Sequence, residues 1–205
     1  MQAVLTTTSS ATSADTEKRN LILATCGLCA GGVLATAIPL VASMSPSERA
    51  HAAGGPVEVD IAGLAPEELR VVEWRGKPVW IFGRDVATLA ALEGHRGELA
   101  DPDSQADQQP GYARNAGRSI RPEVFVAVGI CTHLGCSPVK TEAGAAGSAG
   151  LGADWKGGFF CPCHGSTFDF AGRVFKNKPA PSNLEVPPYR YLSDTRIVIG
   201  EDGVA

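Results

Sequence analysis

Two short segments of the chain carry residues that bind metal ions. They read C-T-H-L-G-C at 131–136 and C-P-C-H-G-S at 161–166. Each segment offers one thiolate and one imidazole at close spacing, and the four candidate ligands are Cys131, His133, Cys161 and His164. Two cysteines and two histidines suit a tetrahedral zinc ion. They equally suit a 2Fe–2S cluster with the cysteines on one iron and the histidines on the other, so spacing alone leaves both open.

The remaining residues of the two segments favour the cluster. Cys136 and Cys163 take equivalent places on the two segments in our interpretation, and a four-ligand zinc site has no use for them. In an oxidising compartment these two cysteines can form a disulfide that joins the segments. Gly135 and Gly165 allow tight turns that present backbone N–H groups to cluster sulfurs.

Together the two segments resemble the Rieske iron–sulfur proteins, whose motif they match. The chain around them is similar to the iron–sulfur subunit of the cytochrome bc complex: it has an apolar stretch near the start, a small-residue segment after Met44, and a proline segment at 178–181. The resemblance therefore covers nearly the whole chain. It implies a Rieske-type 2Fe–2S cluster with Cys131 and Cys161 on one iron and His133 and His164 on the other.

The same resemblance implies roles for further residues. Cys136 and Cys163 would form a disulfide, and the Ser166 hydroxyl would bond a bridging sulfide. One position departs from the pattern: high-potential members have tyrosine where this chain has Phe168. The tyrosine hydroxyl donates to a ligand sulfur, so we expect a lower potential here than in relatives that carry it.

The function implied is that of an electron-transfer subunit of quinol–cytochrome c reductase, a respiratory-chain enzyme. His164 would hydrogen-bond ubiquinol and take its proton, because reduction of the neighbouring iron raises the proton affinity of the ring. Leu134 would dock on cytochrome b, and the electron would pass to a membrane-bound c-type cytochrome. The complex is expected to be dimeric by the same resemblance.

Two other functions use the same ligands. A Rieske small subunit of another membrane-associated oxidoreductase, such as arsenite oxidase, would pass electrons from a molybdenum partner. An exported zinc-binding domain would have no redox role and would be colourless. A Rieske oxygenase or soluble ferredoxin is disfavoured by Cys136, Cys163 and the apolar N-terminal stretch.

Residues 21–44 form a run without a charged side chain or histidine, long enough to cross a bilayer as a helix. Lys18 and Arg19 precede this run, which favours a cytoplasmic segment 1–20 and a head on the periplasmic side of the bacterial inner membrane. A cleaved signal peptide is the alternative, with a small-x-small site at 50–52, but the run is longer than a signal core. Residues 17–21 have the look of a degenerate twin-arginine signal.

Cys26 and Cys29 lie inside the apolar run, where we interpret them as packing residues rather than a redox pair, because nothing nearby lowers a thiol pKa. Residues 45–56 are small and polar and are expected to form a flexible hinge. The head then spans residues 57–205, with the cluster-binding part at about 126–182.

The head is predicted to be mainly β, a Rieske-type antiparallel β-sandwich with a small cluster-binding subdomain. Strands are expected at 57–61, 123–130, 184–192 and 195–200, with hairpins at 70–82 and 167–176. A short helix is expected at 86–92, with His95 on its polar side. Residues 98–121 are expected to form a surface excursion, and residues 142–154 an exposed loop.

The charge balance excludes one class of partner. The chain has 18 Lys and Arg against 22 Asp and Glu, a net charge of −4, and its basic residues do not cluster. Nucleic-acid binding requires clustered cations, so no nucleic-acid partner is expected.

Overall fold

The computed structural model describes residues 11–47, 54–144, 151–152 and 155–202, and it divides into two compact units, Met1–His51 and Ala52–Ala205. The predicted hinge at 45–56 lies partly outside the described residues. The two units are taken here one at a time.

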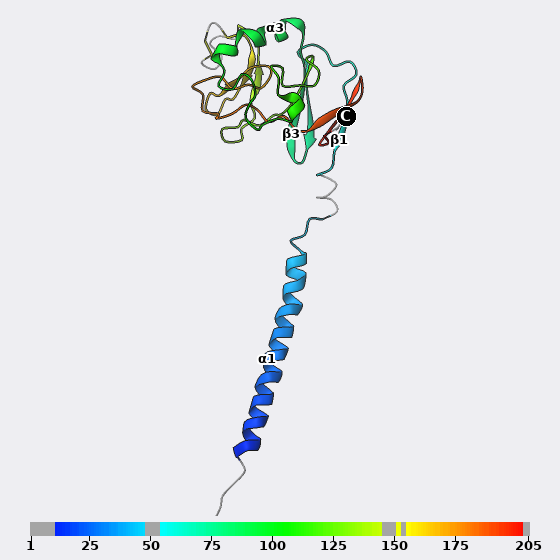
Figure 1. Ribbon diagram of the computed structural model, residues 1–205, viewed down its shortest axis with the longest axis vertical. Helices are drawn as coiled ribbons and strands as arrows, with labels where there is room; N and C mark the ends of the chain where they lie inside the picture. Colours follow the sequence, from blue (N-terminus) through cyan, green and yellow to red (C-terminus); the bar gives the residue numbers. More distant parts are fainter. Residues whose placement is uncertain (1–10, 48–53, 145–150, 153–154, 203–205) are drawn as a thin grey trace, which may run out of the picture. The chain divides into compact units, whose positions relative to one another are not determined.

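The first unit contains one long helix, α1 (Ala11–Ala42), drawn blue in Figure 1. It extends ten residues further toward the N-terminus than the apolar run. Within Asp15–Ala42, an 18-residue window has a mean hydropathy of 2.1, and none of that window is buried, which makes the helix a candidate membrane span. The hydroxyls of Thr25 and Thr36 donate to carbonyls of the preceding turn, so these polar groups are satisfied within the helix.

The second unit, the head, holds three three-stranded antiparallel sheets, as the predicted fold class requires. The base sheet has the order β1-β9-β8, built from β1 (Val57–Asp60), β8 (Tyr189–Ser193) and β9 (Arg196–Ile199). In this sheet β1 and β9 lie side by side in Figure 1, although they come from opposite ends of the head. The sheet therefore closes the head around the segments between them.

The middle sheet has the order β2-β3-β4, with β2 (Leu69–Trp74), β3 (Lys77–Gly83) and β4 (Val124–Val128). The turn between β2 and β3 falls on Arg75 and Gly76, as predicted, and both have positive φ, 52° and 71°. Such two-residue turns match the right-handed twist of a hairpin. β3 is the central strand and is buried from Val79 onward, in keeping with its continuous apolar sequence.

The third sheet has the order β5-β6-β7, with β5 (Val139–Thr141), β6 (Gly158–Phe160) and β7 (Thr167–Phe168). Phe159 of β6 fixes it to the middle sheet. The ring of Phe159 lies 4.8 Å from that of Trp80 and 5.8 Å from that of Phe82, and it also meets Phe125. These aromatic contacts anchor the strand that leads directly into the segment 161–166.

The predicted short helix is present as α3 (Val86–Gly94), whose N-cap Asp85 accepts from the Thr88 amide. The interpretation of His95 was wrong: it is 4% exposed, and its ring meets Phe175 edge-on. His95 is the C-cap residue, beyond the last helical residue of α3, and its ring turns inward there.

The segment 98–121 is likewise not a surface excursion. It contains two short 3-10 turns, Arg96–Glu98 at its start and Gly111–Ala113 within it, and it buries polar side chains together with Leu99 and Ala113. The buried polar residues of the segment are Ser104, Gln109, Arg118 and Ser119. Polar sequence predicts exposure only when the polar groups lack partners in the fold. Here Gln109 and Arg118 donate to backbone carbonyls, and the Ser119 hydroxyl accepts from Arg84.

The hairpin expected at 167–176 is present: Phe168 pairs with Val174, the Phe175 amide donates to the Thr167 carbonyl, and the Asp169 amide donates to the Arg173 carbonyl. The strand expected at 184–192 was too long, since it begins only at Tyr189. The predicted loop at 142–154 lies largely outside the described residues, although Leu151 within it is buried.

Candidate functional site

The two motif segments form two loops of the same backbone shape, here called ligand loop 1 (131–136) and ligand loop 2 (161–166). In loop 1 the Cys131 amide donates to the Cys136 carbonyl over 2.7 Å, and the Gly135 amide donates to the Cys131 carbonyl over 3.0 Å. Loop 2 repeats both bonds: the Cys161 amide donates to the Ser166 carbonyl at 2.8 Å, and the Gly165 amide to the Cys161 carbonyl at 3.0 Å. The first residue of each loop is thus a cysteine whose backbone N–H and C=O groups are both hydrogen-bonded within the loop.

The shared shape explains the glycine at position five of each loop. Gly135 has φ of +85° and Gly165 has φ of +78°. A β-carbon at either position would meet no atom within 4 Å. The requirement for glycine is therefore conformational rather than spatial.

Superimposing the two hydrogen-bond patterns corrects one inference from the sequence. Cys136 is the sixth residue of its loop and corresponds to Ser166, whereas Cys163 is the third residue and corresponds to His133. The two cysteines are therefore not in equivalent places. The asymmetry lets one cysteine of each loop reach across to the other.

Cys136 and Cys163, 27 positions apart in the sequence, do form a disulfide, which confirms the predicted pairing. The Cys161 sulfur lies within 4.8 Å of both disulfide sulfurs. The disulfide therefore joins the two loops immediately beside one of the candidate ligands.

Four potential ligand side chains meet between the loops. Cys131 and Cys161 are each 2% exposed and are close enough for their side chains to interact. The rings of His133 and His164 lie 4.8 Å apart and nearly perpendicular, at 87°. The fold thus brings the two cysteines together and the two histidines together, with one member of each pair from each loop.

One atom at this site tests whether a metal group fits. The Nδ1 atom of His133 is buried and has no hydrogen-bond partner among the described residues. A buried nitrogen without a partner is costly, and a metal ion facing it removes that cost. The donor set of two thiols and two imidazoles, with an orphaned ring nitrogen between them, therefore fits an iron–sulfur group.

The surroundings of Cys131 act in opposite directions on its thiol. Burial raises the pKa of Cys131, and contact with Cys161 adds to this, whereas the His133 amide and the Ser166 hydroxyl favour the thiolate. A positively charged metal ion deprotonates such a thiol outright. The hydrogen-bond donors are thus already arranged for the sulfur in its charged form.

The tip of the site differs in exposure from its base. Leu134 is 71% exposed and His164 is exposed, whereas Ser166 is fully buried. An apolar side chain and an imidazole are therefore presented at the surface, while Cys131 and Cys161 are kept away from water.

A segment behind the loops contacts both of them. The Ala180 amide donates to the Ser166 hydroxyl oxygen, and the Thr132 hydroxyl donates to the Ser182 carbonyl over 2.7 Å. Sequence reasoning missed Thr132, although a threonine between two candidate ligands is a signal in itself. The segment 180–182 thereby fixes the separation of the two loops.

Comparison with known proteins agrees with this geometry. Residues 112–189 match the family described as the Rieske [2Fe-2S] domain. The ubiquinol-cytochrome c reductase iron-sulfur subunit of Allochromatium vinosum is 56% identical over 185 residues, which covers 90% of this chain and 88% of that protein. The subunit of the same name from Blastochloris viridis is 41% identical and covers 96% and 99%, and that of Bradyrhizobium diazoefficiens is 39% identical and covers 95% and 99%.

Proposed function

Because the chain belongs to the iron–sulfur subunits of ubiquinol–cytochrome c reductase, and so transfers electrons through a Rieske 2Fe–2S cluster, we propose which of its residues perform that work. Cys131 and Cys161 hold one iron, and His133 and His164 hold the other. The observation that carries the assignment is the buried Nδ1 of His133, which has no hydrogen-bond partner among the described residues.

When bound, the cluster supplies the one-electron chemistry that links ubiquinol to a membrane-bound c-type cytochrome. The residues around it position the substrate and the proton. His164 is exposed at the tip, so its outer nitrogen can hydrogen-bond ubiquinol and accept a proton. The Ser166 hydroxyl, held by the Ala180 amide, donates toward the sulfurs at the base.

Leu134 is the docking residue for cytochrome b in this proposal. Its side chain is 71% exposed and stands beside the exposed His164, so an apolar pocket on the partner would bury it and bring the imidazole to the quinol. The complex is proposed to be dimeric, as the family resemblance implies.

The first unit anchors the subunit to the membrane. We place α1 in the lipid bilayer across residues 21–44, with residues 1–20 in the cytoplasm and the head on the periplasmic side. Residues 45–56 act as the hinge on which the head moves from cytochrome b toward the c-type cytochrome.

Low-temperature EPR of isolated membranes tests the proposal. Ascorbate reduction should give a Rieske signal, and the quinol-site inhibitor stigmatellin should shift it, because the inhibitor occupies the position that contacts His164. A Rieske signal indifferent to the inhibitor would contradict the quinol contact. Loss of the signal in His164→Ala, with the fold retained by circular dichroism, would support the ligand assignment, and an unchanged signal would refute it.

A further inference from the structure

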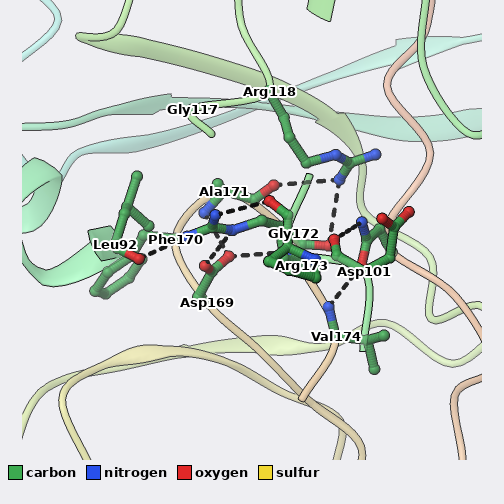
Figure 2. Close-up of polar contacts among 12 residues, drawn as sticks. Leu92, Asp101, Gly117, Arg118, Asp169, Phe170, Ala171, Gly172, Arg173 and Val174 are labelled. Atoms are coloured by element: carbon green, nitrogen blue, oxygen red, sulfur yellow. Dashed lines mark hydrogen bonds and ion pairs between the residues drawn. The ribbon is translucent and has the colours of Figure 1, made fainter. Parts of the chain in front are cut away.

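The interior of the head contains more positive than negative charge. Of the described residues, three arginines and one carboxylate are almost completely buried in this region: Arg84, Arg118, Arg173 and Asp169. Figure 2 shows the residues around Arg118, Arg173 and Asp169 and the dashed contacts between them. One carboxylate balances one guanidinium, so two cations remain without a buried counter-charge.

Arg173 and Asp169 are the balanced pair. The Arg173 Nε donates to Asp169 Oδ2 over 2.8 Å, and the other carboxylate oxygen accepts from the amides of Ala171 and Arg173. Arg173 also donates to the Leu92 carbonyl. The pair thus stabilises the turn at 169–173, and its two charges neutralise each other.

Arg118 has neutral partners only. Its two terminal nitrogens donate to the Gln109 side-chain oxygen and to three carbonyl oxygens, those of Ala171, Gly172 and Leu184. The guanidinium is completely buried. Arg84 is similar, with bonds to the Gly117 carbonyl and the Ser119 hydroxyl.

Asp169 and Asp101 attract Arg118, and Asp169 and Glu123 attract Arg84, but none of these acids is hydrogen-bonded to either guanidinium. Two buried cations without a directly bonded acid demand an explanation. Burying a charge without an opposite charge destabilises a fold, and neutral polar residues can hold carbonyl groups at a lower cost. Burial lowers the pKa of Arg118 to about 10 and that of Arg84 to about 10, so both remain charged at neutral pH. Both guanidinium groups therefore keep their positive charge, although a neutral donor could make the same hydrogen bonds to the carbonyl groups.

Arg118 is connected to both ligand loops through one segment. Its Nη2 donates to the Leu184 carbonyl over 2.7 Å, and Leu184 follows directly on the segment whose Ala180 amide bonds Ser166 and whose Ser182 carbonyl accepts from Thr132. Cys131 and Cys161 also belong to the same buried core as Leu184. The cation thus lies in the same low-dielectric interior as the two buried ligand cysteines.

We propose that Arg118, together with Arg84, is a positioning residue that holds a permanent positive charge in the interior of the head and thereby favours the reduced form of the 2Fe–2S cluster. This inference rests on the cluster assigned under the proposed function. Reduction adds one negative charge to the site, and a fixed cation in a poorly solvated interior stabilises that charge. Because the interior screens charges less than water does, we expect the fixed cation to change the reduction equilibrium severalfold.

The test compares substitutions at position 118 in the full chain within the assembled complex, by redox titration of the Rieske EPR signal. Arg118→Gln removes the charge and keeps hydrogen-bond donors, whereas Arg118→Lys keeps the charge and loses the planar fork. Arg190→Gln is the matched control, because it removes an arginine that is solvent-exposed and paired with Glu201.

We expect Arg118→Gln to lower the reduction equilibrium constant severalfold, and Arg118→Lys and Arg190→Gln to stay near the parent value. An equal fall in the Gln and Lys variants would show a merely structural role and overturn the proposal, as would no fall in Arg118→Gln. Should Arg118→Gln fail to fold, the same comparison of Arg84→Gln with Arg84→Lys decides. Absence of a Rieske signal from the parent complex would instead refute the proposed function.

Discussion

The backbone amide of Ala180 donates a hydrogen bond of 3.0 Å to the side-chain oxygen of Ser166. Ser166 is fully buried, so its hydroxyl group needs a neighbouring acceptor for its own hydrogen bond. The sulfur of Cys131 lies within reach as that acceptor. One hydroxyl thus joins the segment behind the loops to a ligand of the other loop.

Ser166→Ala should therefore have two separable effects. Loss of the donor to the Cys131 sulfur lowers the reduction potential, because hydrogen bonds to sulfur stabilise the reduced cluster. Loss of the acceptor leaves the buried Ala180 amide without a partner and lowers the free energy of unfolding by about 1–3 kcal/mol. Redox titration and thermal unfolding measure the two effects. The exposed neighbour variant Ser137→Ala should change neither, and a Ser166→Ala potential equal to the parent's would contradict the argument.

Phe168→Tyr should raise the potential. Phe168 is fully buried in β7, two residues after Ser166, and the family pattern places at this position a hydroxyl that donates to a ligand sulfur. Potentiometric EPR titration of the parent and the variant checks this, with a Phe168→Leu variant as the control for packing. A Tyr variant with no increase would remove the hydroxyl from the account of the potential.

Removing the disulfide should weaken the site and the fold together. The link closes a loop across 27 residues, which corresponds to about 3–4 kcal/mol in the chain-entropy account of disulfide stabilisation. The double variant Cys136→Ser with Cys163→Ser avoids leaving a free thiol beside Cys161. We expect a lower unfolding temperature and less cluster per chain, measured by the visible absorption.

The matched control for that experiment is Cys26→Ser with Cys29→Ser. Both of these thiols are in α1, exposed and unpaired, and they take no part in the head. Their removal should leave the cluster content and the unfolding of the head unchanged. A comparable loss in both double variants would show that cysteine number, rather than the loop-joining bond, is responsible.

Stiffening the proposed hinge should slow turnover without disturbing the cluster. Two further prolines introduced between residues 45 and 56 restrict the backbone, so the head would move less freely between its partners. Steady-state quinol–cytochrome c reductase activity should fall while the EPR spectrum stays unchanged. Insertion of glycines at the same positions is the control, and rates that survive the prolines would refute the hinge.

His95 should make the head sensitive to acid. Burial lowers the pKa of His95, so the folded state prefers the neutral ring while the unfolded chain keeps an ordinary value of about 6.5. As the pH falls below that value the unfolded state binds the extra proton first, and stability is lost. Chemical unfolding of the parent and His95→Gln at pH 8 and pH 5.5 measures this. Between pH 8 and pH 5.5 the parent should lose more unfolding free energy than His95→Gln. An equal loss in both proteins would contradict a role of His95 in acid sensitivity.

Local signals account for the parts of the fold that the sequence predicted well. The β2–β3 hairpin depends on two turn residues, Arg75 and Gly76, flanked by apolar runs, and the ligands depend on short motifs. Such features are encoded within a few residues, so they can be identified without knowing the rest of the fold.

The predictions that were wrong concern residues whose contact partners lie far away in the sequence. Arg118 is buried because carbonyls at 171, 172 and 184 accept its hydrogens, more than fifty residues later. His95 is buried because Phe175 covers it. The misjudged equivalence of Cys136 and Cys163 has the same origin, since only the hydrogen bonds reveal which positions of the two loops correspond.

The two hydrogen bonds that shape each ligand loop are made within that loop. Each loop is therefore braced within itself, whereas its spacing from the other loop is set by the Cys136–Cys163 disulfide and by the segment 180–182. A substitution in that segment would change the distance between the two loops without changing the path of either one.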